Sequence, residues 1–346
     1  MNAVRRMGAL CRTCVSWLDP FVLLLLLTLL AAALLPPQGA AQGVLSVAGA
    51  VAIAVQFFIS GLRLSTAEAV GGLRVWRLHL LIAAFSFVLF PLLGLGAAAV
   101  SSWYLTPELV AGLLFLTMLP TAVQTAITFT AIAGGNTAAA VCAASISNLL
   151  GIVVTPLLVA LFLGSFSGMN TSSAGRIVLQ IVVPFMLGQL LNRRLGRWAQ
   201  RRAAPLKLMD RGAILLVVYA AFGTAVANGM WDRLPRHQLA VAAGICAQML
   251  ILMLALTFFA ARRMRFDRAD ATAIMFGGSE KSLAAGLPIS AILFPGPLAG
   301  VVILPVIIYH AMQLVLCAGI ARRMAKPSEP ALHSAAAAPD GRIATV

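Results

Sequence analysis

Six consecutive residues, Gly277-Gly278-Ser279-Glu280-Lys281-Ser282, bring polar chemistry into the middle of a long apolar stretch. A pair of glycines loosens a helix, and the backbone carbonyls and amides that are freed become ligands. A charge in a membrane-length apolar segment costs about 2.5–3.5 kcal/mol on insertion scales, so it usually faces a cavity or a partner. This stretch predicts a substrate or ion site on an interrupted transmembrane helix. The alternative is a neutral internal pair of Glu280 and Lys281 that only fixes helix packing.

A second stretch, residues 118–125, has the same design. An apolar run reaches Pro120, and polar side chains follow at the depth of the membrane. Proline lacks an amide donor and disturbs the helical turn before it. The two stretches occupy corresponding places in the two halves of the chain, and paired interrupted segments of this kind indicate the site of a secondary transporter.

Oxygen-bearing side chains beside the two interruptions form a candidate ion site, because carboxylates, amides, hydroxyls and unwound carbonyls suit Na⁺ or proton exchange. The candidate ion ligands are Gln124, Thr125, Ser279, Glu280 and Ser282. The candidate substrate-contacting or cavity-lining residues are Lys281, His310, Gln313, Ser145 and Asn148. Beyond Na⁺ or H⁺ as coupling ion, we expect no metal and no cofactor.

Lys281 has two candidate roles, and the sequence leaves both open. It neutralises Glu280, or it stands where a cation would bind and makes coupling independent of that ion. Neighbouring residues on a regular helix do not face each other, so the two side chains would point apart unless the backbone is unwound.

The composition identifies a polytopic membrane protein. Of 346 residues, 61% are hydrophobic and only 10% are charged, whereas soluble domains carry about 25% charged residues. The net charge of +15 comes from arginines in short connections, as the positive-inside rule expects, and it does not indicate a nucleic-acid partner. The expected partners are membrane lipids and a small-molecule substrate. The chain has no phosphate-binding Gly-x-x-x-x-Gly-Lys-Ser/Thr motif, zinc-protease motif or hydrolase elbow, so it is not expected to be an enzyme.

Ten apolar segments approach membrane length, and basic residues alternate between their connections so that both termini lie in the cytoplasm. The segments are 20–35, 44–62, 78–100, 108–133, 137–164, 177–191, 212–229, 239–261, 270–293 and 298–320. Five spans per half force the second half to enter the membrane upside down, which predicts an all-α fold of two inverted repeats. The predicted organisation is a cytoplasmic segment 1–19, a first repeat 20–164, a linker 165–176, a second repeat 177–325 and a disordered tail 326–346.

Nine short motifs carry a resemblance to the bile acid:sodium symporter superfamily, over roughly residues 20–325. The chain is most similar to a branch of bacterial symporter-like proteins that also has a vertebrate member linked to calcium handling. The motifs are Ser60-Gly-Leu-Arg-Leu64, Trp76-Arg-Leu-His-Leu80, Phe87-Val-Leu-Phe-Pro91, Pro120-Thr-Ala-Val-Gln-Thr125, Ala133-Gly-Gly-Asn136, Ser145-Ile-Ser-Asn-Leu-Leu150, Asp210-Arg-Gly-Ala-Ile214, Gly278-Ser-Glu-Lys-Ser-Leu-Ala284 and Tyr309-His-Ala-Met-Gln313.

The resemblance implies a core domain with broken, crossing helices four and nine, and a panel domain of helices one, two, six and seven. It implies sodium-coupled uptake of an organic anion by alternating access, with two sodium ions behind the crossing. The family's serine–asparagine pair falls on Gln124 and Thr125, but two hydroxyl ligands fall on Ala140 and Ala144, which cannot coordinate an ion. This implies that the first sodium site is dismantled.

The second sodium site of the family maps partly onto polar positions in this chain. Its helix-nine glutamine falls on Glu280, its helix-three glutamine near Ser86 and the shared glutamate near Phe276. The resemblance therefore implies an altered second site around Glu280. The expected function is a sodium- or proton-coupled symporter of the bacterial inner membrane. The alternative is a membrane regulator or partner-binding protein that keeps the fold without ion coupling.

Overall fold

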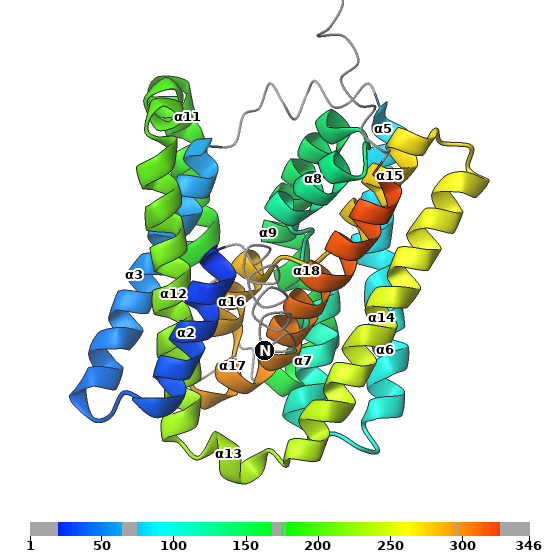
Figure 1. Ribbon diagram of the computed structural model, residues 1–346. Helices are drawn as coiled ribbons and strands as arrows, with labels where there is room; N and C mark the ends of the chain where they lie inside the picture. The colour runs from blue at the N-terminus through cyan, green and yellow to red at the C-terminus, as the bar shows by residue number, and fades with distance from the viewer. Residues whose placement is uncertain (1–19, 64–74, 168–174, 176–177, 295, 326–346) are drawn as a thin grey trace, which may run out of the picture.

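The computed structural model describes residues 20–63, 75–167, 175, 178–294 and 296–325, and in these ranges every regular element is a helix and none is a strand (Figure 1). The predicted N-terminal segment 1–19, most of the linker 165–176 and the predicted disordered tail 326–346 lie outside the described residues.

The first half of the chain contributes α2 (Pro20–Leu34), α3 (Ala40–Arg63), α5 (Trp76–Ala84), the π-helix η2 (Phe85–Leu89), α6 (Phe90–Ser101), α7 (Pro107–Thr117), α8 (Val123–Ile132) and α9 (Thr137–Ser167). The second half contributes the π-helix η3 (Val178–Val182), α11 (Val183–Arg201), α12 (Ala203–Ala227), α13 (Met230–Arg233), α14 (Arg236–Arg263), α15 (Arg268–Ser279), α16 (Leu283–Leu293), α17 (Pro297–Val302) and α18 (Leu304–Met324).

Six stretches of the described chain are long and apolar enough to cross a membrane: α3, the series α5–η2–α6, α9, α12, α14 and the pair α17–α18. The helices α2, α7 and α8 are apolar but shorter. Eight of the ten predicted apolar segments overlap one or more of these helices, with α12 beginning nine residues before its predicted start at residue 212. The other two, 177–191 and 270–293, overlap η3 and α11 and the pair α15 and α16. The count of ten spans and the inverted symmetry of the halves stay predictions.

Two groups of helices stand beside each other. α2, α3, α11 and α12 pack together on the left of Figure 1, and α5 to α9, α14, α15 and α18 form the larger group on the right. α16 and α17 contact α12 and so join the two groups. The helices α2, α3, α11 and α12 overlap predicted spans one, two, six and seven, which the resemblance assigns to the panel domain.

Two glycines allow α3 and α11 to touch along their backbones. A Cβ atom at Gly61 would clash with the carbonyl of Phe185, and a Cβ at Gly188 would clash with the carbonyl of Phe58. The side-chain amide of Asn192 donates to the carbonyl of Leu62 at 2.6 Å, which adds a polar contact between the same two helices. Small residues at this crossing let the helices approach closely, which is how apolar helices associate inside a bilayer.

The glycines of α3 provide a test of this contact. Gly61→Ala should lower the stability of the detergent-purified protein by about 1–3 kcal/mol, because α3 and α11 must separate to admit the methyl group. Gly49→Ala on the same helix is the matched control, since a Cβ there has nothing within 4 Å. The control should be neutral or stabilising by up to about 1 kcal/mol. Equal melting temperatures for the two variants would contradict the close backbone contact.

Candidate functional site

Two connections between consecutive helices, one from α7 to α8 and one from α15 to α16, touch each other. α7 ends at Thr117 and α8 begins at Val123, while α15 ends at Ser279 and α16 begins at Leu283. Between them Ala122, Glu280 and Ser282 have extended backbone conformations. The backbone amide of Ser282 donates to the carbonyl of Pro120 at 2.9 Å, so residues from distant parts of the sequence form one polar centre.

The two glycines before Glu280 have a different role from the one predicted. α15 stays helical through both of them and ends only at Ser279. A Cβ at Gly277 would lie 2.9 Å from the Cδ1 of Ile82, and a Cβ at Gly278 would lie 2.8 Å from the Cγ2 of Thr257. The glycines therefore serve close packing against α5 and α14, and the helix ends after them.

α9 holds the connection between α7 and α8. The hydroxyl of Ser147 accepts from the amide of Thr121 at 3.0 Å, and the side chain of Asn148 donates to the carbonyl of Thr121 at 3.0 Å. The hydroxyl of Thr155 donates to the carbonyl of Met118 at 2.7 Å. These three side chains satisfy backbone groups between the end of α7 and the start of α8, as an apolar interior requires.

α18 holds the connection between α15 and α16 in a similar way. Gln313 accepts from the amide of Lys281 at 2.9 Å and donates to the carbonyl of the same residue at 3.0 Å. Its amide nitrogen also lies 2.9 Å from Nδ1 of His310. The hydroxyl of Tyr309 donates to the carbonyl of Ser279 at 2.7 Å. Gln313 and Tyr309 thus fix the backbone on both sides of Glu280.

Thr121 joins the two connections through its side chain. Its hydroxyl donates to the carbonyl of Gly277 at 2.7 Å and lies 3.1 Å from the hydroxyl of Ser147. The hydroxyl of Ser86, in the π-helix η2, lies 3.2 Å from the same atom. One threonine therefore links the first connection to α15, α9 and η2, so these four elements are positioned together.

Glu280 is completely buried, with none of its surface exposed. The hydroxyl of Thr125, on α8, donates to its Oε2 atom. Its Oε1 atom is buried and has no hydrogen-bond partner among the described residues. A buried carboxylate oxygen with an open coordination position suits a cation or a proton, because burying an unpaired charge is expensive.

Lys281 is also completely buried, and its side chain leaves the backbone away from Glu280. Its Nζ atom donates to the carbonyls of Ser86, Thr117 and Leu119, whereas Glu280 is bound by Thr125. Glu280 has an extended backbone, and successive side chains of an extended segment point to opposite sides, which explains the separation. The two residues have different partners, so the neutral internal pair considered as an alternative is not what the structure shows.

A cavity of about 500 Å³ separates these connections from the group of α2, α3, α11 and α12. Six of the ten predicted site residues line it: Gln124, Thr125, Ser145, Asn148, Ser282 and His310. The other four lie behind this wall. Ser279 donates to the carbonyl of Met275 at 2.6 Å, Gln313 binds the backbone of Lys281, and Glu280 and Lys281 are enclosed around the two connections.

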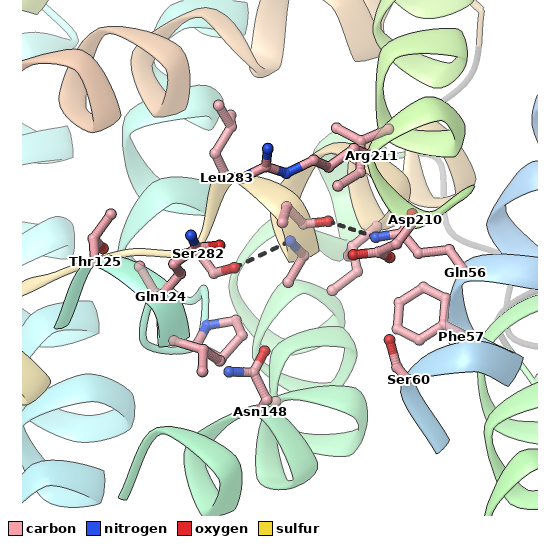
Figure 2. A pocket seen from close by; sticks show the side chains of 18 of the residues that line it. Gln56, Phe57, Ser60, Gln124, Thr125, Asn148, Asp210, Arg211, Ser282 and Leu283 are labelled. Carbon is pink, nitrogen blue, oxygen red and sulfur yellow. Dashed lines mark hydrogen bonds between the residues drawn. The ribbon is translucent and has the colours of Figure 1, made fainter. Parts of the chain in front are cut away.

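The opposite wall of the cavity contains polar residues that the sequence analysis did not select. These are Gln56, Ser60, Arg63, Lys207, Asp210 and Arg211, from α3 and α12. Figure 2 shows Gln56, Ser60, Asp210 and Arg211 facing Gln124, Thr125 and Ser282 across the cavity. The side-chain amide of Gln56 donates to the carbonyl of Ala284 at 3.1 Å, which links α3 to α16.

Two signals in the sequence pointed to this wall. Gln56 and Ser60 stand four residues apart in an otherwise apolar segment, so they share one helix face. Asp210 is an acidic residue inside a basic stretch, and the sequence analysis used the arginines of that stretch only to assign topology. The positive-inside rule explains the arginines but not the carboxylate of Asp210, so this residue indicated a role other than setting the topology.

Comparison with known proteins assigns the chain to a family. The model of the SBF-like CPA transporter family matches residues 19–326. The protein belongs to this family. Its members are transporters rather than enzymes, and together with the six membrane-length helices the match identifies a multi-pass membrane protein.

Three relatives illustrate the range of the family. "Uncharacterized protein PA2026" of Pseudomonas aeruginosa is 43% identical over 323 residues, covering 93% of this chain and 97% of the relative. "Putative symporter YfeH" of Escherichia coli K12 is 41% identical over 313 residues, covering 90% and 94%. "Sodium/bile acid cotransporter 7" of Rattus norvegicus is 33% identical over 276 residues, covering 77% and 79%.

The contact of Gln313 with the backbone of Lys281 can be tested by an apolar replacement of similar size. Gln313→Met should destabilise the protein by about 2–4 kcal/mol, because a buried amide and a buried carbonyl both lose their partner. Gln248→Met, on the exposed face of α14, is the matched control and should change stability by less than about 0.5 kcal/mol. Thermal unfolding in detergent measures both, and a neutral Gln313→Met would rule out the structural role.

Proposed function

We propose that this protein is a secondary active transporter of the bacterial inner membrane that moves a small organic anion together with Na⁺ or H⁺. The observation that carries the proposal is a cavity of about 500 Å³ between two groups of helices, with polar residues on both walls and a buried, partly unpaired carboxylate behind one of them. A cavity of this size is in the range of small-molecule sites. The family match and the relatives named as symporters support the same class.

The proposed mechanism is alternating access, in which α2, α3, α11 and α12 move against the larger group. Each of the pairs α7–α8 and α15–α16 would form one interrupted span, giving ten spans in two inverted repeats with both termini in the cytoplasm. One likeness between the halves supports this arrangement: α9 binds the backbone of the first connection and α18 binds that of the second. Relative motion of helix groups around a midplane site is the general scheme for such transporters.

The proposed coupling-ion site is the carboxylate of Glu280 with Thr125. Thr125 lines the cavity and donates to Glu280, so it connects the carboxylate to the route that an ion would take. Gln124 and Ser282 line the cavity near the same point and offer further oxygen atoms. Ser279 remains a candidate only through its backbone, because its hydroxyl donates to Met275.

The proposed substrate class follows from the charges of the opposite wall. Arg63, Lys207 and Arg211 carry three positive charges, and Asp210 carries one negative charge. Arg211 also lies over the ring of Phe21, at 5.0 Å from its centroid, which restrains its guanidinium group. A wall with excess positive charge attracts an anion, and arginine binds carboxylates and phosphates with two parallel hydrogen bonds. Ser145, Asn148 and His310 would contact the remainder of the solute from the other side.

The coupling ion can be identified from the stability of the purified protein. In NaCl, compared with choline chloride, the wild type should gain about 2.7 kcal/mol at a hundred times the dissociation constant, and Glu280→Gln should lose that gain. Coupling to protons would instead produce a pH-dependent melting temperature that Glu280→Gln removes. Glu108→Gln, in the first turn of α7, is the control and should keep the response. A wild type whose stability responds to neither ion would contradict ion coupling. It would favour the alternative function, a membrane regulator or partner-binding protein without ion coupling.

The anion-binding wall can be tested with a panel of ligands. Taurocholate and smaller carboxylates and sulfonates should raise the melting temperature more than the corresponding neutral amides. Arg211→Gln should weaken the affinity for the best anion by about tenfold or more, since a hydrogen bond to a charged group contributes about 1.5–3 kcal/mol. Arg263→Gln, at the exposed end of α14, should leave the affinity unchanged. Stronger responses to the neutral amides would reject an anionic substrate.

A further inference from the structure

The ammonium group of Lys281 lies in a small cage of backbone oxygens. Its Nζ atom is 2.9 Å from the carbonyl oxygen of Ser86, 3.0 Å from that of Thr117 and 2.7 Å from that of Leu119. The ring of Phe90 closes another side, with its centroid 4.5 Å from Nζ. An aromatic face and three carbonyls are an environment for a dehydrated cation.

The cage exists because two helices are irregular at this point. Thr117 ends α7 and Leu119 follows it, so their carbonyls have no amide of a continuing helix to bind and carry the negative end of the helix dipole. Ser86 lies in the π-helix η2, where the changed hydrogen-bond register alters the partners of the backbone carbonyls. The oxygens are therefore supplied by the backbone and would remain if the lysine side chain were removed.

The number of backbone acceptors around Nζ matches the number of N–H donors of an ammonium group. A neutral amine has two N–H donors and an ammonium has three, and three carbonyl oxygens lie within hydrogen-bond distance of Nζ. A neutral amine would turn its lone pair toward one of these oxygens. The geometry fits the charged form, with one N–H for each carbonyl.

We propose that the ammonium of Lys281 is a tethered cation, which permanently fills a backbone site that would otherwise bind a free monovalent cation such as Na⁺. It also connects the end of α7, through Thr117 and Leu119, to the segment between α15 and α16. The proposal stands on these contacts and is independent of transport. If the protein is a transporter, the tethered ammonium prevents this site from binding and releasing an ion during the transport cycle. The exchangeable cation would then bind beside Glu280.

The test is to remove the side chain and ask whether a free cation replaces it. Lys281→Ala empties the cage, and Glu280→Gln in the same protein removes the other candidate cation site. The melting temperature of Lys281→Ala/Glu280→Gln should rise by roughly 3 °C or more in NaCl or KCl over choline chloride, because an ion that binds only the folded state stabilises it. Ethylammonium chloride, which resembles the deleted end of the side chain, should also raise it. Glu280→Gln alone should respond to none of these salts.

Lys281→Met is the matched control, because methionine fills the space with an apolar side chain of similar length. In the Glu280→Gln background it should be less stable than its parent, and no cation should restore it. A response of Lys281→Ala to small cations that Lys281→Met lacks supports the tethered cation. Two results would overturn the proposal. In the first, Lys281→Ala/Glu280→Gln has the same melting temperature in every salt. In the second, this double variant does not fold in any of the salts.

The single and double variants together separate the tethered cation from the proposed coupling. Loss of the sodium response in Glu280→Gln, with no new response in the double variant, would support coupling at Glu280 and reject the tethered cation. A new cation response in the double variant, with a wild type that is indifferent to Na⁺ and pH, would support the tethered cation and reject coupling.

Discussion

The backbone polar groups at the ends of α7, α8, α15 and α16 must all find partners inside an apolar body, and the rest of the site depends on this constraint. Each unpaired amide or carbonyl in such an interior costs several kcal/mol. The amide of Ser282 binds the carbonyl of Pro120, so the two connections satisfy each other in part. Side chains from α9, α18 and the lysine beside Glu280 satisfy further groups.

This constraint divides the polar residues of the interior into two kinds. Gln313, Tyr309 and Thr155 use their polar atoms to bind backbone, and they hold the connections in place. Thr125 and Gln124 instead line the cavity. In the sequence all of these residues look the same, namely a polar side chain in an apolar segment, although only the second kind lines the cavity.

The cavity lies where two groups of helices with different roles face each other. One wall consists of the connections, whose positions are held by many hydrogen bonds, and it places a buried carboxylate behind Thr125. The other wall comes from α3 and α12, and α3 packs with α11 through contacts between small residues. The cavity therefore lies between a wall fixed by hydrogen bonds and a separately packed group of helices, as the proposed alternating access requires.

The sequence by itself determined the membrane class, the apolar segments and the family. Apolar runs, proline and charge are local properties, and motifs are read in order along the chain. It also identified the polar residues on one wall, because polar side chains in apolar segments are conspicuous. The resemblance supplied the grouping of helices that surrounds the cavity.

Only the tertiary structure decided which polar atoms pair. It separated Glu280 from Lys281, turned Gln313 toward the backbone and brought Asp210 and Arg211 into the cavity. It also gave Gly277 and Gly278 a packing role, since the atoms that require them belong to α5 and α14. The physical reason is common to these cases: partners of a buried polar group, and neighbours of a glycine, come from segments far away in the sequence. The residue type shows that a buried polar group needs a hydrogen-bond partner, or that a glycine is packed closely. Only the packing of the helices determines which distant residue supplies the partner or the close neighbour.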